Sequence, residues 1–408
     1  MMLRCGLLGE KLKHSYSPMI HAQLADYAYR LYERAPEELD LFLRSAEWDG
    51  LNVTIPYKKT VVPYCDVLSP QARQLGSVNT LVHLPDGRLY GDNTDYFGFS
   101  CLVDSSGIRV AGRRAVVLGS GGASVTVCAV LHAMGAESVA VISRRGEDNY
   151  QNLDRHADAQ IIVNTTPLGM YPDNGKAAVD LRRFPKCEGV FDLIYNPART
   201  ALLMQAEELG IPCRSGLRML VAQAARSCER FTGGTVDASR IGEIEQTICA
   251  KLQNIVLLGM PGCGKSTVAA ALGKRLGRPV YDSDALVAQR AGMTIPEIFS
   301  RDGEERFRAL ESEVLSELGK LSGAVISTGG GCVTRAENYP LLHQNGRIFW
   351  LQRALESLPA EGRPLSRKHS PQELYARRER LYERFADRVI DNNGSVEQTA
   401  ERIEESLQ

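Results

Sequence analysis

Two glycine-rich stretches decide the fold of this chain: Gly119-Ser120-Gly121-Gly122-Ala123-Ser124 and Gly259-Met260-Pro261-Gly262-Cys263-Gly264-Lys265-Ser266. Each directly follows a short apolar run, residues 115–118 and 255–258, that predicts a buried strand. A strand, a glycine turn and a helix N-terminus bring backbone N–H groups to a point that binds phosphate. The first stretch lacks a lysine and suits a dinucleotide pyrophosphate, whereas the second ends in Lys-Ser and suits a nucleoside triphosphate with magnesium. Two phosphate loops of different chemistry predict two enzymes joined end to end.

The length and composition are those of a soluble globular protein with two or three domains. The chain has 408 residues, of which 44% are hydrophobic and 24% charged. A net charge of −1 gives no indication of nucleic-acid or membrane binding. The ten cysteines form no C-x-x-C pair, which argues against a zinc or redox site. With no secretory signal or membrane span evident, we expect reduced thiols, a cytoplasmic location, small-molecule substrates only, and a monomer or homodimer.

The order of the expected elements predicts an α/β protein. Residues 3–8 and 51–55 are expected as strands and residues 18–27 as a helix. From residue 113 to 215, strand, turn and helix alternate, which predicts a parallel sheet covered on both faces. The strands of this region are expected at residues 116–118, 139–142, 161–164 and 189–192, and the helices that follow it at residues 217–231 and 237–252.

The second half begins with a strand at Asn254 and closes with a helix at residues 396–407. No Pro/Gly/Ser-rich tether separates the halves, so a close junction is expected. We predict a first enzyme over residues 1–250. It comprises a substrate lobe (about 1–100 and 217–250) and a Rossmann-type cofactor lobe (about 105–215). A P-loop parallel-sheet domain, like that of nucleoside monophosphate kinases, is predicted over residues 253–408.

Residues after the second strand of the cofactor lobe indicate which dinucleotide binds. The strand at 139–142 ends in Ser143-Arg144-Arg145. A site that prefers NAD usually has Asp or Glu there, which accepts a hydrogen bond from the ribose 2′-OH. Two arginines instead suit a 2′-phosphate, so NADP(H) is expected; the alternative is a solvated basic strand end. The residues expected to bind it are Gly119, Ser120, Gly121, Gly122, Ala123, Ser143, Arg144 and Arg145.

Polar clusters in the N-terminal third are candidate substrate ligands. They are His14-Ser15-Tyr16-Ser17-Pro18, Asn52-Val53-Thr54-Ile55-Pro56-Tyr57-Lys58-Lys59, Ser77-Val78-Asn79-Thr80 and Gly91-Asp92-Asn93-Thr94-Asp95. A purely structural account makes Ser17 a helix N-cap with Pro18 at N1, and makes the last two clusters turns. That account leaves Ser15 unexplained.

Together these clusters resemble the shikimate dehydrogenase family over roughly residues 3–250. The resemblance also includes Asn164-Thr165-Thr166-Pro167-Leu168-Gly169-Met170, Asp192-Leu193-Ile194-Tyr195-Asn196-Pro197 and Gly216-Leu217-Arg218-Met219-Leu220-Val221-Ala222-Gln223-Ala224. It implies reduction of 3-dehydroshikimate to shikimate with NADPH. By position, Lys58 and Asp95 would be the catalytic pair. The residues that would hold the substrate are Ser15, Ser17, Thr54, Asn79 and Gln223. Residues 146–159 are short for a full crossover helix.

The second loop matches G-x-x-x-x-G-K-[ST] without a mismatch and precedes a helix expected at residues 267–276. Lys265 would reach the β- and γ-phosphates, and the Ser266 hydroxyl would ligate Mg²⁺. Gly262, Cys263, Gly264 and Thr267 complete the expected ATP loop. Tyr281-Asp282-Ser283-Asp284 ends the next strand with two carboxylates, which serve either the metal and the acceptor hydroxyl or only as helix caps.

The later motifs of this half resemble the shikimate kinase family over about residues 254–400. They are Gly303-Glu304-Glu305-Arg306-Phe307-Arg308, Ser327-Thr328-Gly329-Gly330-Gly331, Arg363-Pro364-Leu365 and Arg377-Arg378-Glu379-Arg380-Leu381-Tyr382. The resemblance implies phosphorylation of the shikimate 3-hydroxyl with ATP. Asp284, Arg308, Gly330 and Arg378 would bind shikimate. Asp282 would serve magnesium, Asp284 and Lys265 would act in catalysis, and Arg363 would come from a closing lid. Residues 351–363 are several residues short for this lid.

Two alternatives stay open. One is a related dehydrogenase that acts on quinate or uses NAD. The other is a P-loop domain that only senses nucleotide and regulates the dehydrogenase. Asp284, Arg308 and Arg378 argue against a pure sensor, because a sensor needs no acceptor site.

Overall fold

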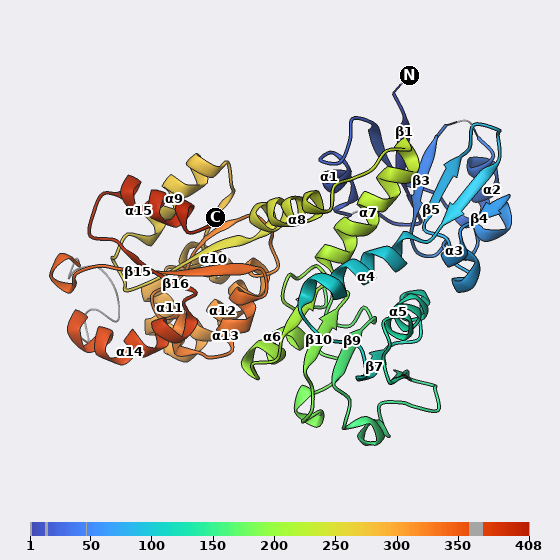
Figure 1. Ribbon diagram of the computed structural model, residues 1–408. Helices are drawn as coiled ribbons and strands as arrows, with labels where there is room; N and C mark the ends of the chain where they lie inside the picture. Colours follow the sequence, from blue (N-terminus) through green and yellow to red (C-terminus); the bar gives the residue numbers. More distant parts are fainter. Residues whose placement is uncertain (1, 13–14, 46, 359–369, 408) are drawn as a thin grey trace. The chain divides into compact units, whose positions relative to one another are not determined.

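The computed structural model describes residues 2–12, 15–45, 47–358 and 370–407 (Figure 1). The chain divides into two compact units. Unit 1 comprises Met1–Leu168, Ala177–Tyr195 and Gln205–Ile248, and unit 2 comprises Gly169–Lys176, Asn196–Met204 and Cys249–Gln408. Within the described ranges, every helix is too short or too polar to cross a lipid bilayer.

The first sheet of unit 1 is mixed and has the strand order β2-β1-β3-β5-β6-β4. Strand β1 pairs in parallel with β2 and β3, whereas β5 is antiparallel to β3 and β6. Buried Leu8, Trp48, Leu51 and Leu81 belong to its core. The strands are β1 (Arg4–Gly9), β2 (Ala28–Glu33), β3 (Gly50–Val53), β4 (Val67–Leu68), β5 (Thr80–His83) and β6 (Leu89–Asp92), and the helices are α1 (Ser17–His21), α2 (Leu39–Leu43) and α3 (Pro70–Leu75).

The helix predicted at residues 18–27 is wrong beyond His21. Helix α1 has five residues, and residues 28–33 form β2, which pairs with β1 over its whole length. The alternating sequence Tyr-Ala-Tyr-Arg-Leu-Tyr at residues 27–32 suits a strand. Residues 28–33 therefore form a strand, because pairing with β1 satisfies their backbone N–H and C=O groups. A helix over these residues would leave this edge of β1 unpaired.

The second sheet of unit 1 is wholly parallel, with the order β11-β10-β9-β7-β8. The predicted strands and the two predicted helices of this region are present, with ends shifted by at most a few residues. The long helices α4 and α7 pack against each other. The elements are α4 (Thr94–Ser106), β7 (Arg114–Leu118), α5 (Gly122–Ala133), β8 (Ser138–Ile142), β9 (Ile161–Asn164), β10 (Gly189–Asp192), α6 (Ala201–Glu208), β11 (Cys213–Ser215), α7 (Leu217–Thr232) and α8 (Ala238–Leu252).

The crossover from β8 to β9 contains no α-helix. Its only helical turn is a 3₁₀ helix at Leu153–His156. This agrees with the expectation that residues 146–159 do not form a full crossover helix. Leu153 is buried and anchors this turn. Strand β8, at the edge of this sheet, is partly exposed.

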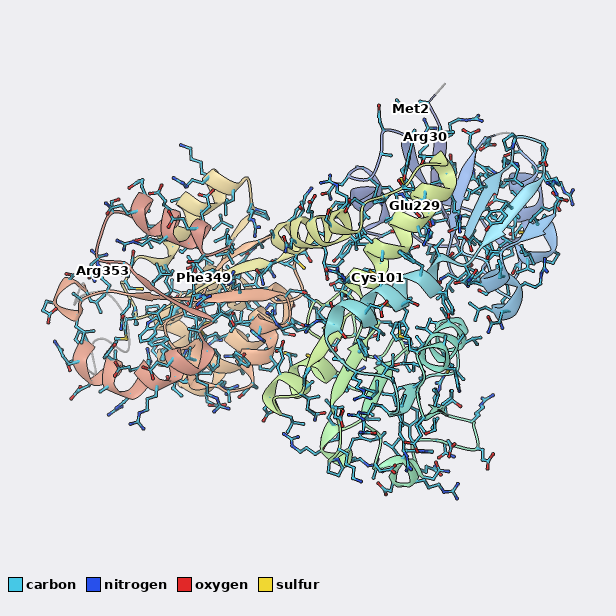
Figure 2. All side chains as sticks on the ribbon, viewed as in Figure 1. Met2, Arg30, Cys101, Glu229, Phe349 and Arg353 are labelled. Atoms are coloured by element: carbon cyan, nitrogen blue, oxygen red, sulfur yellow. The ribbon has the colours of Figure 1, made fainter. Side chains whose placement is uncertain are left out.

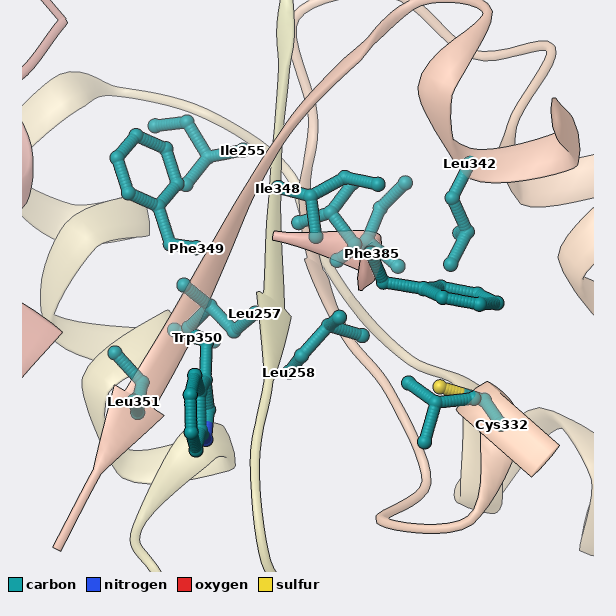
Figure 3. Packing of buried hydrophobic residues seen from close by; sticks show 14 of the residues in the cluster. Ile255, Leu257, Leu258, Cys332, Leu342, Ile348, Phe349, Trp350, Leu351 and Phe385 are labelled. Carbon is teal, nitrogen blue, oxygen red and sulfur yellow. The ribbon is translucent and has the colours of Figure 1, made fainter. Parts of the chain in front are cut away.

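Unit 2 is built on a third parallel sheet with the order β13-β14-β12-β15-β16. Its core includes Ile255 and Leu257 of β12, Ile348 and Phe349 of β15, and Phe385 of α14 (Figure 3). The strands are β12 (Asn254–Leu258), β13 (Val280–Asp282), β14 (Val325–Ser327), β15 (Gly346–Gln352) and β16 (Arg388–Asp391). The helices are α9 (Lys265–Leu276), α10 (Ser283–Ala291), α11 (Ile295–Arg301), α12 (Gly303–Leu318), α13 (Asn338–His343), α14 (Pro371–Phe385) and α15 (Val396–Glu405).

Two short segments of unit 2 come from earlier in the sequence, before residue 205. The Ala198 N–H donates to Asn345 Oδ1 at 2.8 Å, and the Arg199 N–H donates to the Gln344 carbonyl at 2.8 Å. Asn174 Nδ2 donates to Gln344 Oε1 at 2.7 Å. Unit 2 is therefore more than a continuous C-terminal segment.

Candidate active sites

The predicted catalytic pair of unit 1 is brought together from two separate elements. Lys58 follows β3 and Asp95 lies in the first turn of α4, and Lys58 Nζ lies 2.6 Å from Asp95 Oδ2. The side chains are 29% and 15% exposed, respectively, so each is largely shielded but still reachable from solvent. The Lys58 carbonyl accepts a hydrogen bond from the Val78 N–H at 2.8 Å, which fixes the backbone beneath the ammonium group.

Ser15 and Ser17 lie at the start of α1, but the expected cap is wrong. Tyr16 is the N-cap, and Ser17 is the first helical residue. The Ser15 hydroxyl accepts a hydrogen bond from the Ser17 N–H at 3.2 Å. Ser15, which a capping interpretation left unexplained, therefore shapes the turn that leads into the helix. Thr54 is half-buried directly after β3, four residues before Lys58.

Asn79 and Gln223 meet through a network of buried side chains. Asn79 Oδ1 accepts from the Thr94 N–H at 2.7 Å. The Thr94 hydroxyl lies 3.5 Å from Gln223 Oε1 and 3.1 Å from Ser227 Oγ. Ser227 also accepts from Asn52 Nδ2 at 2.7 Å. These residues come from β3, α4, α7 and the segment just before β5, so the network assembles only in the folded chain.

The same network extends toward Ser17. Tyr29 donates its hydroxyl proton to Asn52 Oδ1 at 2.8 Å. Burial raises the pKa of the Tyr29 phenol, and a hydrogen bond from Ser17 partly opposes that rise. Ser17, Asn79 and Gln223, which the sequence predicted as substrate ligands, are therefore linked by hydrogen bonds, whereas among the described residues no side-chain hydrogen bond joins Thr54 to this network.

The first glycine loop has the open geometry that a phosphate needs. Gly119 has φ +105°, and a Cβ there would lie 2.8 Å from Thr165 Oγ1, so no other residue fits. Gly121 is the N-cap of α5. Ser124, which replaces the third glycine of the usual motif, is buried. The residues Ser120, Gly121, Gly122 and Ala123 are exposed, as are Arg144 and Arg145, and Ser143 is half-buried.

The second loop wraps the Lys265 ammonium. Lys265 is 8% exposed, and its Nζ donates to the carbonyls of Gly259 at 2.9 Å and Met260 at 3.1 Å. Gly264, with φ +100°, is the N-cap of α9, whose first turn includes the exposed Ser266 and Thr267. Gly262 is half-buried and Cys263 is fully buried, in agreement with a packing role for the thiol.

Asp282 acts both as a helix cap and as a partner of the phosphate loop. Its Oδ1 accepts from the N–H groups of Asp284 at 3.0 Å and Ala285 at 3.2 Å. Its Oδ2 lies 2.6 Å from Ser266 Oγ and 3.1 Å from Ser327 Oγ. A carboxylate and a hydroxyl at one point form a hard oxygen donor set, which fits Mg²⁺ when nucleotide phosphates complete its shell.

A cavity of about 680 Å³ extends from the phosphate loop to the predicted acceptor residues. Arg308 and Arg378 are each 5% exposed, and both line it together with Asp284. Arg378 Nη1 donates to the Gly330 carbonyl at 3.1 Å. Of the arginines at residues 377–388, Arg378 is the buried one, whereas Arg377, Arg380, Arg384 and Arg388 are exposed.

Glu311 is a cavity residue that the sequence analysis missed. It is fully buried and accepts a hydrogen bond from Arg308 Nη1 at 2.7 Å. Burial raises the pKa of its carboxyl group, while Arg308 opposes that rise. A Cβ on Gly329 would lie 2.5 Å from both Glu311 Oε1 and Asp284 Oδ1. The available signal was its position three residues after Arg308, which places both on one helix face.

The lid prediction cannot be placed, because Arg363 lies outside the described residues. Besides Lys265, a cationic residue near the phosphate loop is Arg353, which directly follows β15 (Figure 2). Its Nη1 lies 3.8 Å from the position that a Cβ on Gly264 would occupy. The sequence analysis did not single it out.

Comparisons with known proteins match the two parts of the chain to two different families. Residues 7–81 match the family model for the shikimate dehydrogenase substrate binding domain, and residues 261–408 match that for shikimate kinase. A shikimate dehydrogenase (NADP(+)) of Clostridium beijerinckii is 36% identical over 243 residues, which are 55% of this chain and 90% of the relative.

Solved structures show the same relationship for the first part. A shikimate 5-dehydrogenase from Thermus thermophilus, in complex with NADP(H) and shikimate, is 31% identical with a TM-score of 0.55. The match covers 60% of this chain and 99% of that one. A quinate dehydrogenase from Corynebacterium glutamicum, in complex with NAD, is 29% identical with a TM-score of 0.54, covering 60% and 99%.

Proposed function

The chain belongs to the shikimate dehydrogenase family and carries a shikimate kinase domain after it, and we propose that it is bifunctional. It reduces 3-dehydroshikimate to shikimate with NADPH, and then phosphorylates the shikimate 3-hydroxyl with ATP to give shikimate 3-phosphate. The main observation behind the kinase assignment is one cavity that is lined both by the phosphate loop and by the acceptor residues. Its lining includes Lys265, Ser266, Arg308 and Arg378. This cavity supports the proposal that the second unit is a kinase with an acceptor site, and the acceptor we propose is the first unit's product.

In the dehydrogenase, bound NADPH supplies the hydride. Reduction of the ketone leaves an alkoxide oxygen that needs a proton and a nearby cation, and the Lys58 ammonium offers both. The Asp95 carboxylate at 2.6 Å holds the ammonium in position and balances its charge. The residues that bind the oxygens of the cyclic acid are assigned from their positions in the motifs. They are Ser15, Ser17, Thr54, Asn79 and Gln223.

In the kinase, two planar guanidinium groups pair with the substrate carboxylate. Asp284 faces the acceptor hydroxyl, and the carbonyl of Gly330 is fixed by Arg378. Lys265 stabilises charge on the transferred phosphoryl group, and Ser266 with Asp282 holds Mg²⁺. We keep Arg363 as a lid residue that neutralises charge and helps exclude water.

A coupled assay tests the proposal. The intact chain is given 3-dehydroshikimate, NADPH, ATP and Mg²⁺, and both NADPH loss and shikimate 3-phosphate are followed. We expect one phosphate ester for each NADPH consumed once ATP is in excess. A Lys265→Met variant should stop at shikimate. If that variant still phosphorylates shikimate at the full rate, the phosphoryl-transfer assignment is wrong; if the intact chain never phosphorylates shikimate, the domain is a nucleotide sensor instead.

A quinate-directed or NAD-using dehydrogenase is the second candidate, supported by the similarity to the quinate dehydrogenase. Arg144 and Arg145 at the end of β8 favour NADP instead. Rates with quinate against shikimate, each with NAD and NADP, distinguish the two. We further propose a cytoplasmic monomer or homodimer without nucleic-acid or membrane partners.

A further inference from the structure

Thr94, which the sequence analysis did not single out, makes polar contacts with two of the proposed substrate residues, Asn79 and Gln223. It is 1% exposed and lies between Asn93, the N-cap of α4, and Asp95 of the catalytic pair. Its N–H donates to Asn79 Oδ1 at 2.7 Å, and its hydroxyl lies 3.2 Å from the same oxygen. The Thr80 hydroxyl also points at Asn79 Oδ1, at 3.2 Å.

These contacts determine how the Asn79 carboxamide is turned. The two ends of a carboxamide have almost the same shape, so its orientation follows from its partners. A backbone N–H can only donate, so the atom 2.7 Å from the Thr94 nitrogen must be the amide oxygen. The Asn79 NH₂ group therefore points away from Thr94, and within the described ranges no protein acceptor is bonded to it.

The Thr94 hydroxyl also reaches the second proposed ligand. It lies 3.5 Å from Gln223 Oε1, while Gln223 Nε2 donates to the Leu220 carbonyl at 2.9 Å. On the next turn of α7, the Ser227 hydroxyl donates to the Gln223 carbonyl at 2.9 Å and lies 3.1 Å from the Thr94 hydroxyl. Thr94 thus contacts Asn79 and Gln223 from a single buried position next to Asp95.

We propose that Thr94 is a positioning residue that holds Asn79 as a hydrogen-bond donor toward the substrate. The inference rests on the proposed function, since Asn79 is a substrate residue only by that assignment. The reaction interconverts a hydroxyl group and a ketone. Both oxygens can accept a hydrogen bond, but a ketone cannot donate one. A donating NH₂ group at Asn79 therefore suits an oxygen of the cyclic acid in either oxidation state.

The test separates positioning from simple packing. Thr94→Val keeps the shape and the N–H but removes the hydroxyl, and Thr94→Ser keeps the hydroxyl. For Thr94→Val we expect the KM for shikimate in NADP reduction to rise about three- to tenfold, as for one lost neutral hydrogen bond. The KM should rise more than kcat falls, and Thr94→Ser should restore most of it. A denaturant-unfolding curve of unit 1 that matches the native chain's shows that the variant is folded.

A double-mutant cycle with Asn79→Ala decides whether Thr94 acts through Asn79. In that background, Thr94→Val should have little further effect on KM. An equal effect in both backgrounds, or no effect of Thr94→Val on the native chain, overturns the inference. If Thr94→Val is not obtained folded, Thr80→Val removes another hydroxyl from Asn79 Oδ1 and must raise KM in the same way. If the native chain itself shows no shikimate-dependent NADP reduction, the proposed function fails, and Thr94 loses its role with it.

Discussion

At the residue scale, His21 is a buried base outside the proposed catalytic pair. It is fully buried, with Nδ1 2.6 Å from the Tyr27 hydroxyl and its ring stacked on Tyr29 at 3.9 Å between centroids. Burial lowers its pKa to about 3, and a hydrogen bond with Asn52 only partly opposes this. The folded chain therefore holds His21 neutral through the range in which an unfolded chain would protonate it.

This shift predicts a pH-dependent stability for unit 1. Because burial depresses the folded pKa of His21, this residue does not reduce the free energy of unfolding above the unfolded pKa of 6.5. The free energy of unfolding falls as pH drops from 6.5 toward 3. Between pH 7 and pH 5 the free energy of unfolding should drop by about 2 kcal/mol from this group alone. Denaturant unfolding at both pH values measures it. His21→Gln should remove that part of the pH dependence; an unchanged dependence would show that other groups cause it.

The two arginines after β8 lead to a second prediction at this scale. Arg144 and Arg145 are exposed and free to meet a 2′-phosphate. Arg144→Ser should raise the KM for NADPH about 10- to 100-fold, because a charge-assisted hydrogen bond is lost, and should leave the KM for NADH nearly unchanged. Steady-state rates with both cofactors provide the measurement. An equal loss with NADH would mean that the arginine supports the loop and does not read the phosphate.

At the scale of elements, the glycine loop after β14 is shaped by the side chains behind it. A Cβ on Gly331 would overlap the guanidinium of Arg308, which is buried and paired with Glu311 at 2.7 Å. Gly331→Ala should therefore displace Arg308 and raise the kinase KM for shikimate at least tenfold, the scale of one lost charged hydrogen bond. Dehydrogenase activity of the same chain should not change.

The matched control is Gly242→Ala, in helix α8, where the nearest atom to an added Cβ is Arg218 Nη1 at 3.9 Å. This variant should keep both activities. A Gly331→Ala chain with native kinase kinetics would show that Arg308 adjusts freely, against the rigid pairing with Glu311.

The elements that follow from a local pattern of apolar residues and turns were predictable from the sequence. The strand that depends on pairing with a distant strand was not. The strands β9 and β10 and the helix α7 match the expected ranges closely, because short apolar runs between glycine turns carry their own signal. Strand β2 was missed because its identity depends on β1, more than twenty residues earlier in the sequence. Between β8 and β9 the chain forms a 3₁₀ turn and no α-helix, in line with the expectation from the sequence.

At the scale of the whole molecule, the two proposed catalytic centres use separate sets of residues. Lys58 and Asp95 lie in unit 1, whereas Lys265, Arg308 and Arg378 lie in unit 2. Lys58→Ala should lower the rate of hydride transfer about 10²- to 10⁴-fold, as for loss of a proton donor, and leave phosphorylation of added shikimate intact. Assaying each reaction alone on one preparation tests this. Loss of both activities would indicate that the two units depend on each other for folding.

The sequence by itself determined both families, the class of fold and the two phosphate loops, because these features rest on contiguous residues whose spacing carries the chemistry. The comparisons confirm both families and NADP as the cofactor of relatives. Only the tertiary structure decided that Thr94 turns the Asn79 amide, that Glu311 lies behind Arg308, and that Arg353 stands beside Gly264. Hydrogen-bond geometry between side chains from separate elements depends on packing to within a few tenths of an ångström, and no local pattern of residues encodes that distance.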